Sequence, residues 1–543
     1  MKTAKRKKRI AGDRFGRGET ELGLNVTSSN SKANSNAGPE LVIALTAAVG
    51  TDVDRVAGIL KTELSGFSYN AQTIHLIEEL HQIERWSSLA DETVDQRYKS
   101  HMDAGNEFRT LLGRRDAIAL LAASCISRQR ARFTGDSNSP SPRTAYILRS
   151  VKKPAEIDTL RRIYGENVFV LGIYAPEDSR IDDLAKKIAS SHGAGKGKTF
   201  EALATALVQR DQEETENVYG QNVRGAFPMA DFFIDVSDAA QITTHIQRVL
   251  SLIFGTSIET PTRDEYGMFL AHGAGLRSAS LGRQVGACIC AEDGAVMAVG
   301  CNEVPRAGGG LYWTGDPGDQ RDHIVGVDSN DQIKRQLLQD VLGRLKSAGW
   351  LNEPKSVLTD TELLNDALAT APIRSAKLMD IIDYGRAVHA EMSALIDAAR
   401  HGMPIRDCVL YATTFPCHNC AKHLLAAGIK RVVYVEAYAK SFVSELFSDS
   451  VAIDEPHPAE GLIRFQPFVG VSPRKYSSVF SMGDSIRKKD GKVLVRQKAH
   501  ATPRFATPPH TYLISEKQQI SVFRELLDGK ELEVEDDYKK ASK

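Results

Sequence analysis

The chain has 543 residues, of which 42% are hydrophobic and 25% charged, proportions typical of soluble globular proteins. Lysine plus arginine and aspartate plus glutamate both number 69, so no net charge favours nucleic acid or an anionic membrane surface. The sequence has no run of about 18 apolar residues that could span a bilayer, which predicts a cytoplasmic protein without membrane partners.

The first 38 residues predict a disordered tail. The basic cluster MKTAKRKKRIAGDRFGRG is followed by NVTSSNSKANSNAG, a Ser/Asn/Gly tract with few apolar residues. The tail also lacks the apolar segment of a signal peptide. A basic tail can contact RNA or an acidic partner, but most such tails are solvated.

Residues 39–260 predict a parallel α/β domain. The runs ELVIALTA, AYILRS and NVFVLGIYA are short and rich in Val, Ile and Leu, a pattern typical of buried parallel strands. Between them lie amphipathic helical patterns such as RRDAIALLAASCISRQRARF and SRIDDLAKKIASSH. This alternation favours a parallel sheet with helices on both faces.

The first of these strands leads into a turn that is typical of a phosphate-binding loop in every respect except charge. A buried strand at 41–46, a tight turn at 48–50 and a helix from about Asp52 give the expected context. The lysine that neutralises phosphate charge is absent, because Thr51 follows the glycine and Asp52 repels phosphate. Backbone N–H groups at the helix start can still hold an anion weakly. The residues of this degenerate nucleotide site are Ala48, Val49, Gly50 and Thr51.

A second stretch, SSHGAGKGKTFEALA, is closer to the phosphate-loop motif in letters but not in context. Its first glycine is one position short, and it follows an amphipathic helix instead of a buried strand. We predict a mobile, basic loop between two helices. The first domain is therefore expected to be regulatory or a scaffold, the alternative being an active kinase.

A second α/β block is predicted at 261–490. Its expected elements are the helix RDEYGMFLAHGAGLRSAS, a strand pair in QVGACICAEDGAVMAVGCNEV, the helix HAEMSALIDAARHG, the strand DCVLYATT, the helix CHNCAKHLLAAGI and the strand RVVYVEAY. A Gly-rich, charged insertion at 306–386 interrupts the block. Residues 491–543 are polar and charged, which predicts a C-terminal extension on the surface or partly disordered.

The strongest motif is H-x-E at 389–391 followed by P-C-x-x-C at 416–420. Cys417 and Cys420, three apart at a helix start, project from one face and can hold one metal ion. The helix N-terminus favours their thiolate forms, and His389 supplies a third ligand. Three protein ligands leave tetrahedral zinc one open position, as in catalytic sites. An odd, clustered set of seven cysteines also favours metal ligands over disulfides.

Glu391, two residues after the histidine, is better placed beside a zinc-bound water than on the metal, as in zinc deaminases. Zinc lowers the pKa of bound water towards 7. Glu391 would take the water proton, pass it to N3 of cytosine while hydroxide adds at C4, and then protonate the departing amine. The alternative is a structural zinc site, which has no use for Glu391. His418 within C-x-x-C is expected to face solvent.

The stretch from Asp264 to Gly309 and the zinc motif resemble the deoxycytidylate deaminases, which have a helix, a Q-V-G-A strand and a G-x-N turn before the zinc helix. The resemblance implies a cytidine/deoxycytidylate-deaminase-like α/β/α zinc fold. It also implies that Asn302 binds the sugar–base edge of a free nucleotide and that Ala390 lines the substrate site. The alternative for Asn302 is a turn-stabilising role.

The whole chain resembles the bacterial antiphage dCTP deaminases, which join a P-loop-kinase-like domain to a deaminase. The supporting stretches are AYILRSVKKPAEIDTLRRIYG, RDQEETENVYGQNVRGAFPMADFFID, YWTGDPGDQRDHIVGVDSND and VEAYAKSFVSELFSDS. The resemblance implies deamination of dCTP, with dCMP as a second candidate, to deplete dCTP during phage infection. It also implies a homo-oligomer and control by an inhibitory RNA or a phage-derived trigger.

Lys440 and Ser441 precede a predicted short helix and can bind a phosphate at its start; a surface lysine beside a helix cap is the alternative. Three other functions stay open: a housekeeping dCMP deaminase, a kinase or nucleotide switch, and a nucleic-acid cytidine deaminase. Zero net charge and the lack of a basic, aromatic stretch beside the zinc motif disfavour a polynucleotide substrate.

Overall fold

The computed structural model describes residues 38–195, 197–214, 217–436, 441–455, 459–483, 487–494, 496–530 and 532. The predicted tail, except for its last residue, and Lys440 lie outside this part of the chain. Among the described residues, none of the helices combines the length and the apolar character that a membrane crossing requires.

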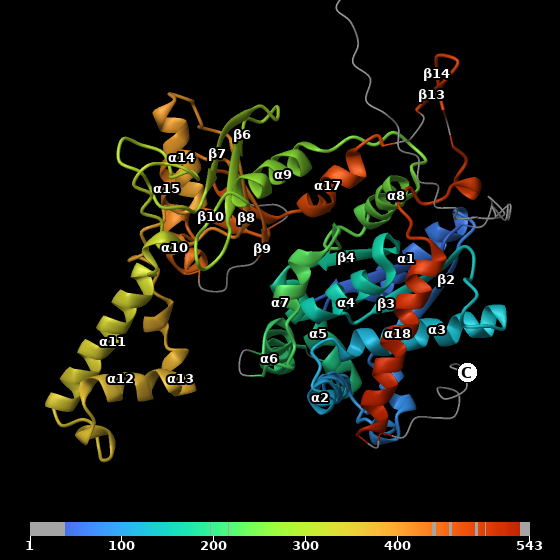
Figure 1. Cartoon of the computed structure of the whole chain (residues 1–543), viewed down its shortest axis with the longest axis horizontal. Coiled ribbons are helices and arrows are strands. Elements are labelled where there is room, and N and C mark those ends of the chain that lie inside the picture. Colours follow the sequence, from blue (N-terminus) through green and yellow to red (C-terminus); the bar gives the residue numbers. More distant parts are fainter. Residues whose placement is uncertain are drawn as a thin grey trace, which may run out of the picture. The chain divides into compact units, whose positions relative to one another are not determined.

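The first sheet has six strands in the order β12-β5-β4-β1-β3-β2. Its strands are β1 (Leu41–Ala47), β2 (Asn70–His75), β3 (Thr144–Arg149), β4 (Val168–Tyr174), β5 (Phe232–Asp235) and β12 (Gly470–Val471). Strands β2, β3 and β4 are labelled in Figure 1. Strands β1 to β5 are parallel, and β12 is antiparallel to β5. The predicted parallel sheet and its three predicted strands, here β1, β3 and β4, are confirmed.

The two faces of this sheet carry separate cores. Leu41, Ile43 and Leu45 of β1 pack with α1 (Val53–Gly66) and α8 (Gln241–Phe254). The alternate residues of β1 pack on the other face with α3 (Ala117–Thr134), α4 (Pro154–Tyr164) and α18 (Pro509–Asp528). Because successive strand residues point to opposite faces, burial on both faces explains the continuous apolar runs in the sequence. The remaining helices beside this sheet are α2 (Val94–Leu112), α5 (Glu177–Ser191), α6 (Glu201–Gln212) and α7 (Val223–Ala226).

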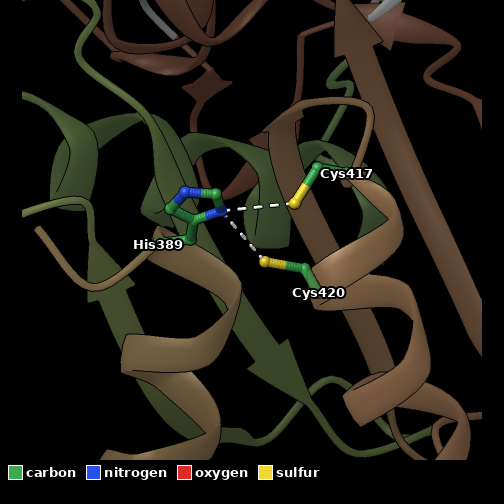
Figure 2. A group of neighbouring side chains, drawn as sticks. All are labelled: His389, Cys417 and Cys420. Atoms are coloured by element: carbon green, nitrogen blue, oxygen red, sulfur yellow. Dashed lines mark hydrogen bonds between the residues drawn. The ribbon is translucent and has the colours of Figure 1, made fainter. Parts of the chain in front are cut away.

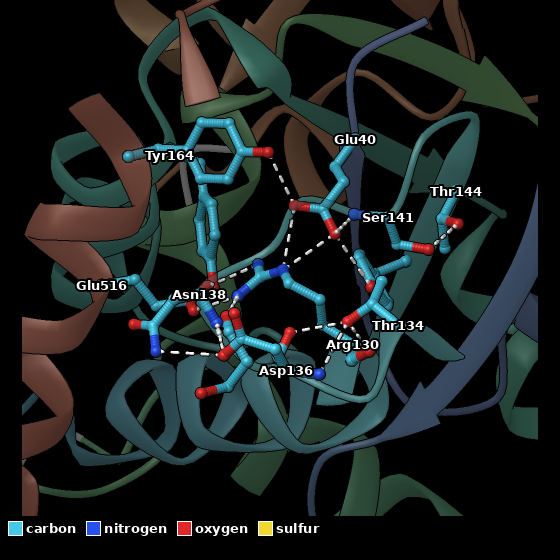
Figure 3. A network of polar contacts seen from close by, with 12 residues as sticks. Glu40, Arg130, Thr134, Asp136, Asn138, Ser141, Thr144, Tyr164 and Glu516 are labelled. Atoms are coloured by element: carbon cyan, nitrogen blue, oxygen red, sulfur yellow. Dashed lines mark hydrogen bonds and ion pairs between the residues drawn. The ribbon is translucent and has the colours of Figure 1, made fainter. Parts of the chain in front are cut away.

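Helix α18 corrects the expectation of a surface extension at the C-terminus. Its residues Tyr512, Glu516 and Phe523 are buried against α3 and α4. Glu516 pairs with Arg130 of α3, which also pairs with Glu40 beside β1 (Figure 3). Helix α18 therefore completes the core of the first sheet. Its polar sequence did not indicate that a charged residue, Glu516, is buried there in an ion pair.

The second sheet has the order β10-β11-β9-β8-β6-β7. Its strands are β6 (Gly286–Cys290), β7 (Val296–Cys301), β8 (Val409–Thr414), β9 (Arg431–Glu436), β10 (Val451–Ile453) and β11 (Ile463–Pro467). β6 is antiparallel to β7 and β8, whereas β8, β9, β11 and β10 are parallel. Helix α9 (Arg263–Gly275) packs on one face, and α14 (Ala390–Arg400) and α15 (His418–Ala426) contribute to the core on the other. The predicted helices, hairpin and strands of this block are confirmed.

The insertion is helical and has a small core of its own. It contains α10 (Asp322–Val325), α11 (Ser329–Ser347), α12 (Asp360–Ala369) and α13 (Ala371–Arg374), and Leu338, Leu342, Leu363 and Ala367 form its buried hydrophobic core. A bridge between Glu303 and Val388 joins its two ends. The other short elements are α16 (Val443–Leu446), α17 (Pro473–Phe480), β13 (Lys488–Lys489) and β14 (Lys492–Val493).

Candidate active site

Two helix N-termini converge on the predicted metal ligands (Figure 2). His389 is the N-cap residue of α14 and Cys417 is the N-cap residue of α15, both with extended backbone. Cys420 lies in the first turn of α15. Because the N-terminal end of a helix carries partial positive charge, this arrangement favours thiolates over thiols. The structure therefore brings the three predicted ligands together.

The donor atoms have the spacing that a single zinc ion requires. Nδ1 of His389 lies 3.3 Å from Sγ of Cys417 and 3.4 Å from Sγ of Cys420. All three donor atoms lie within 4.8 Å of one another. Zn–N and Zn–S bonds of about 2.0 and 2.3 Å at tetrahedral angles place nitrogen and sulfur about 3.5 Å apart. The nitrogen and two sulfurs therefore fit a tetrahedral zinc ion with one position left for another ligand.

Glu391 lies against this cluster on the first turn of α14. It is 4% exposed, and its Oε2 is 3.5 Å from Sγ of Cys420. Burial, followed by the negative charge of Cys417, raises the pKa of Glu391. A carboxyl group with a raised pKa accepts a proton more readily than an ordinary carboxylate and can pass it on to a substrate. Its position suits a proton carrier beside the metal better than an additional ligand.

The two sulfurs differ in their affinity for protons. A hydrogen bond from the Cys420 thiol, together with one to His389, lowers the pKa of Cys417. The same hydrogen bond, with burial, raises the pKa of Cys420. Because metal ligation requires both sulfurs as thiolates, binding of the ion releases the proton that the two cysteines share.

A glycine allows α14 to lie close to the sheet. A Cβ atom on Gly300 of β7 would lie 2.3 Å from the carbonyl oxygen of Ala390, far inside contact distance. Any larger residue at position 300 would push away the helix that carries His389 and Glu391. Ala390 itself is fully buried in the core under α14, and its predicted substrate contact stays a prediction.

Asn302 stabilises a loop beside the end of β7. Its Oδ1 accepts the Val285 N–H at 2.7 Å, and its Nδ2 donates to the Arg283 carbonyl at 2.8 Å. These bonds are those of the turn-stabilising alternative. The predicted contact with the sugar–base edge stays a prediction.

Ser441 lies beside the cysteine motif. Its hydroxyl donates to the carbonyl of Pro416 at 2.9 Å, which ties the segment before α16 to the residue preceding Cys417. Its predicted partner in phosphate binding, Lys440, is outside the described residues. The phosphate contact stays a prediction for both.

The sequence analysis did not predict that the insertion brings Asp383 against α15, the helix that carries Cys420. Asp383 accepts a 2.7 Å hydrogen bond from Nδ2 of Asn419, which lies between the two cysteines. Oδ1 of the same asparagine accepts a bond from Lys422. The only sequence feature that could have indicated this contact is the position of Asp383, because the insertion ends directly before His389.

Phe442 lies beside both the cysteine motif and the part of the insertion that contains Lys377. The ring of Phe442 lies 5.6 Å from that of His418, in an edge-to-face arrangement. The ammonium group of Lys377 lies 5.7 Å from the centre of the Phe442 ring. Phe442 is 39% exposed, so its ring is accessible beside the cysteine motif.

The turn after β1 has the local structure that the sequence predicts. It connects β1 to α1, and Asp52 caps α1 by accepting the Arg55 N–H. Gly50 has a φ of +90°, and a Cβ there would lie 2.6 Å from the Arg180 carbonyl oxygen. The nucleotide-binding role of residues 48–51 stays a prediction.

Comparison with known proteins places residues 261–436 in the family model described as the cytidine and deoxycytidylate deaminase zinc-binding region. The chain is 44% identical to the deoxycytidylate deaminase of Enterobacteria phage T2 over 54 residues, which are 10% of this chain and 29% of that protein. It is 32% identical to the human deoxycytidylate deaminase over 93 residues, 17% of this chain and 43% of that protein.

The chain thus spans less than half of the length of either relative. A crystal structure of the dCMP deaminase from cyanophage S-TIM5 aligns over 38% of this chain and 99% of that chain with 17% identity. Its TM-score of 0.20 is too low to bear on the fold. The family match and the clustered ligands together identify residues 261–436 as a deaminase-like domain with a zinc-binding region.

Proposed function

We propose that the protein hydrolyses the exocyclic amine of a free deoxycytidine nucleotide, producing the deoxyuridine nucleotide and ammonia. The observation that carries the proposal is the buried Glu391 carboxyl group beside a three-donor metal cluster. A purely structural zinc site takes four protein ligands, whereas the cluster within the described part of the chain has three. The open position and the adjacent acid support catalysis.

Zinc held by His389, Cys417 and Cys420 would supply a Lewis acid that brings the pKa of a coordinated water close to 7. Glu391 accepts the proton of the attacking water and delivers it to N3 of the cytosine ring as the oxygen adds to C4. The same side chain then takes the proton of the new C4 hydroxyl group and delivers it to the amine, so that the C4–N bond breaks, ammonia leaves and the C4 carbonyl forms. Because burial raises its pKa, Glu391 can hold the proton between these steps.

The proposed substrate is dCTP, with dCMP as the second candidate. Cationic side chains near the cysteine motif, Lys377 and Lys422, support a substrate that carries phosphate. The whole-chain resemblance supports the triphosphate and a role in depleting dCTP during phage infection. The names of the relatives support a deoxycytidine monophosphate, which suits a housekeeping dCMP deaminase equally well.

The first domain is proposed to be a P-loop-like regulatory domain. Support comes from the turn between β1 and α1 and from the central place of β1 in a parallel sheet. We further propose a cytoplasmic homo-oligomer controlled by an inhibitory RNA or a phage-derived trigger; the resemblance alone supports these points.

The test is incubation of the purified, zinc-loaded chain with dCTP, dCMP, CTP and cytidine, followed by chromatography of the products and an ammonia assay. We expect dUTP from dCTP, and no product with Glu391→Ala. A clear preference for dCMP would favour the housekeeping function instead. Uracil in a polynucleotide, with binding that weakens steeply with salt, would favour nucleic-acid editing. Zinc-loaded protein that releases no ammonia from any of these substrates or from single-stranded nucleic acid would refute a deaminase.

A further inference from the structure

The turn after β1 already holds an anion, and that anion belongs to the chain itself. Oδ2 of Asp211 accepts the Val49 N–H at 2.7 Å. Asp211 lies near the end of α6, 162 positions further along the sequence, and is 1% exposed. In phosphate-binding loops, backbone N–H groups of such a turn point at phosphate oxygens. Here a carboxylate oxygen takes that place.

The turn has no lysine of its own, and the loop after the neighbouring strand β3 supplies the positive charge. Lys152, in the loop after β3, has its Nζ 3.0 Å from both carboxylate oxygens of Asp211. The same Nζ donates to the carbonyl oxygen of Ala47, the last residue of β1, at 2.7 Å. Its side chain is 15% exposed. Lys152 thus places an ammonium group beside the turn, although it does not occupy the lysine position of the phosphate-loop motif.

A second buried cation faces the same turn. Arg180, at the start of α5, donates from Nη1 to the carbonyl oxygen of Val49 at 3.2 Å. Its side chain is 8% exposed. Two hydroxyl oxygens beside the turn, Oγ1 of Thr46 and Oγ1 of Thr51, are buried and have no hydrogen-bond partner among the described residues. The surroundings of the turn therefore offer more polar groups than Asp211 uses.

We propose that this turn is a phosphate-type anion site that Asp211 keeps closed. Phosphate and polyphosphate groups compete with the Asp211 carboxylate for the Val49 N–H and for Lys152. In the closed state α6 is held against β1 by its own carboxylate. Binding of a phosphate ligand requires the end of α6 to release the turn, which makes the site weak in the wild-type protein.

Without the Asp211 carboxylate, a phosphate ligand no longer has a competitor for the Val49 N–H and Lys152. Asp211→Ala leaves the buried Val49 N–H without its acceptor and the part-buried Lys152 ammonium group without its carboxylate partner, and both losses destabilise the fold. An anion from solution can restore both interactions. Any ligand that binds only the folded state then raises the unfolding temperature in proportion to the logarithm of its concentration.

The experiment measures thermal unfolding of the full-length, zinc-loaded protein in pyrophosphate or inorganic phosphate, against chloride at equal ionic strength. We expect Asp211→Ala to unfold below wild type in chloride and to bind pyrophosphate at least about tenfold more tightly than wild type, as loss of a competing buried charge predicts. Lys152→Ala in the same background should abolish the gain. Glu213→Ala is the matched control, because it removes an acid two positions away that pairs with Arg224 at the surface.

Asp211→Asn keeps the volume of the side chain and serves if the alanine variant does not fold. It should bind pyrophosphate more tightly than wild type and leave the Val49 amide less protected from hydrogen exchange. Equal pyrophosphate binding in wild type and both variants, including none in any of them, would overturn the proposal. So would a gain that survives loss of Lys152. None of these readouts depends on deamination.

Discussion

Sγ of Cys420 lies 3.5 Å from Oε2 of Glu391, so the proposed proton carrier and a proposed metal ligand are in contact. The two residues come from different helices, α15 and α14, whose N-termini meet at this point. The contact makes separate roles for metal binding and proton transfer testable, because each residue can be changed without removing the other.

Replacing the carboxyl group of Glu391 should slow deamination strongly without removing the metal. Glu391→Gln keeps the side-chain volume but cannot accept a proton, and general acid–base catalysis is worth about 10²- to 10⁴-fold. We expect kcat to fall by about that factor while zinc content, measured by elemental analysis, stays at the wild-type value. Asp397→Asn, on the same helix and part exposed, is the control and should change neither. Loss of zinc in Glu391→Gln would instead make Glu391 a ligand.

Replacing a sulfur should remove the metal. Cys417→Ser exchanges a thiolate for a hydroxyl group that ionises poorly at neutral pH, so zinc affinity should fall steeply. After chelation and dialysis, added zinc should restore activity to wild type and to Cys408→Ser, whose sulfur lies outside the cluster. Cys417→Ser should remain inactive with sub-stoichiometric zinc. Full zinc recovery by Cys417→Ser would show that the cluster is not the metal site.

The metal cluster could be predicted from sequence because its geometry is local. H-x-E at a helix start and P-C-x-x-C at another place the donors through helical spacing alone, and the strand between them brings the helices together. The buried strands β1, β3 and β4 were predictable for the same reason, since their apolar runs need no partner to be recognised.

What escaped prediction depends on contacts between distant parts of the chain. Strand β2, NAQTIH, is mostly polar, so its sequence has no apolar pattern that would predict a strand paired with β3. The ion pair of Glu516 with Arg130 spans 386 positions, and the bond of Asp211 to Val49 spans 162. In the last two cases a charged residue, which the sequence alone would place in solvent, is buried against a partner far away in the chain.

The insertion should tune the response to substrate phosphates. Because the Lys377 ammonium group lies near Phe442 and hence near the cysteine motif, Lys377→Ala should raise KM more for dCTP than for dCMP, and least for deoxycytidine. We expect a several-fold rise for dCTP with kcat and zinc content unchanged, as loss of one solvent-screened charge contact predicts. Steady-state kinetics with the three substrates measures this. Lys355→Ala, within the insertion but paired with Asp366, should leave all three values unchanged; equal KM rises for all substrates would exclude a phosphate contact.

Helix α18 should be required for the stability of the first domain. Arg130 is fully buried between two carboxylates, and Oε2 of Glu516 also accepts the Tyr164 hydroxyl at 2.6 Å. Glu516→Ala leaves Nη2 of Arg130 and the Tyr164 hydroxyl group buried without their acceptor, which costs about 1–3 kcal/mol for each group, while Glu40 still balances the charge of Arg130. Glu525→Ala, on the exposed side of the same helix, should change the free energy of unfolding by less than about 0.5 kcal/mol. Urea unfolding followed by circular dichroism measures both. If the two variants lose equal stability, the ionic network does not hold α18 in place, and its apolar residues alone account for the packing.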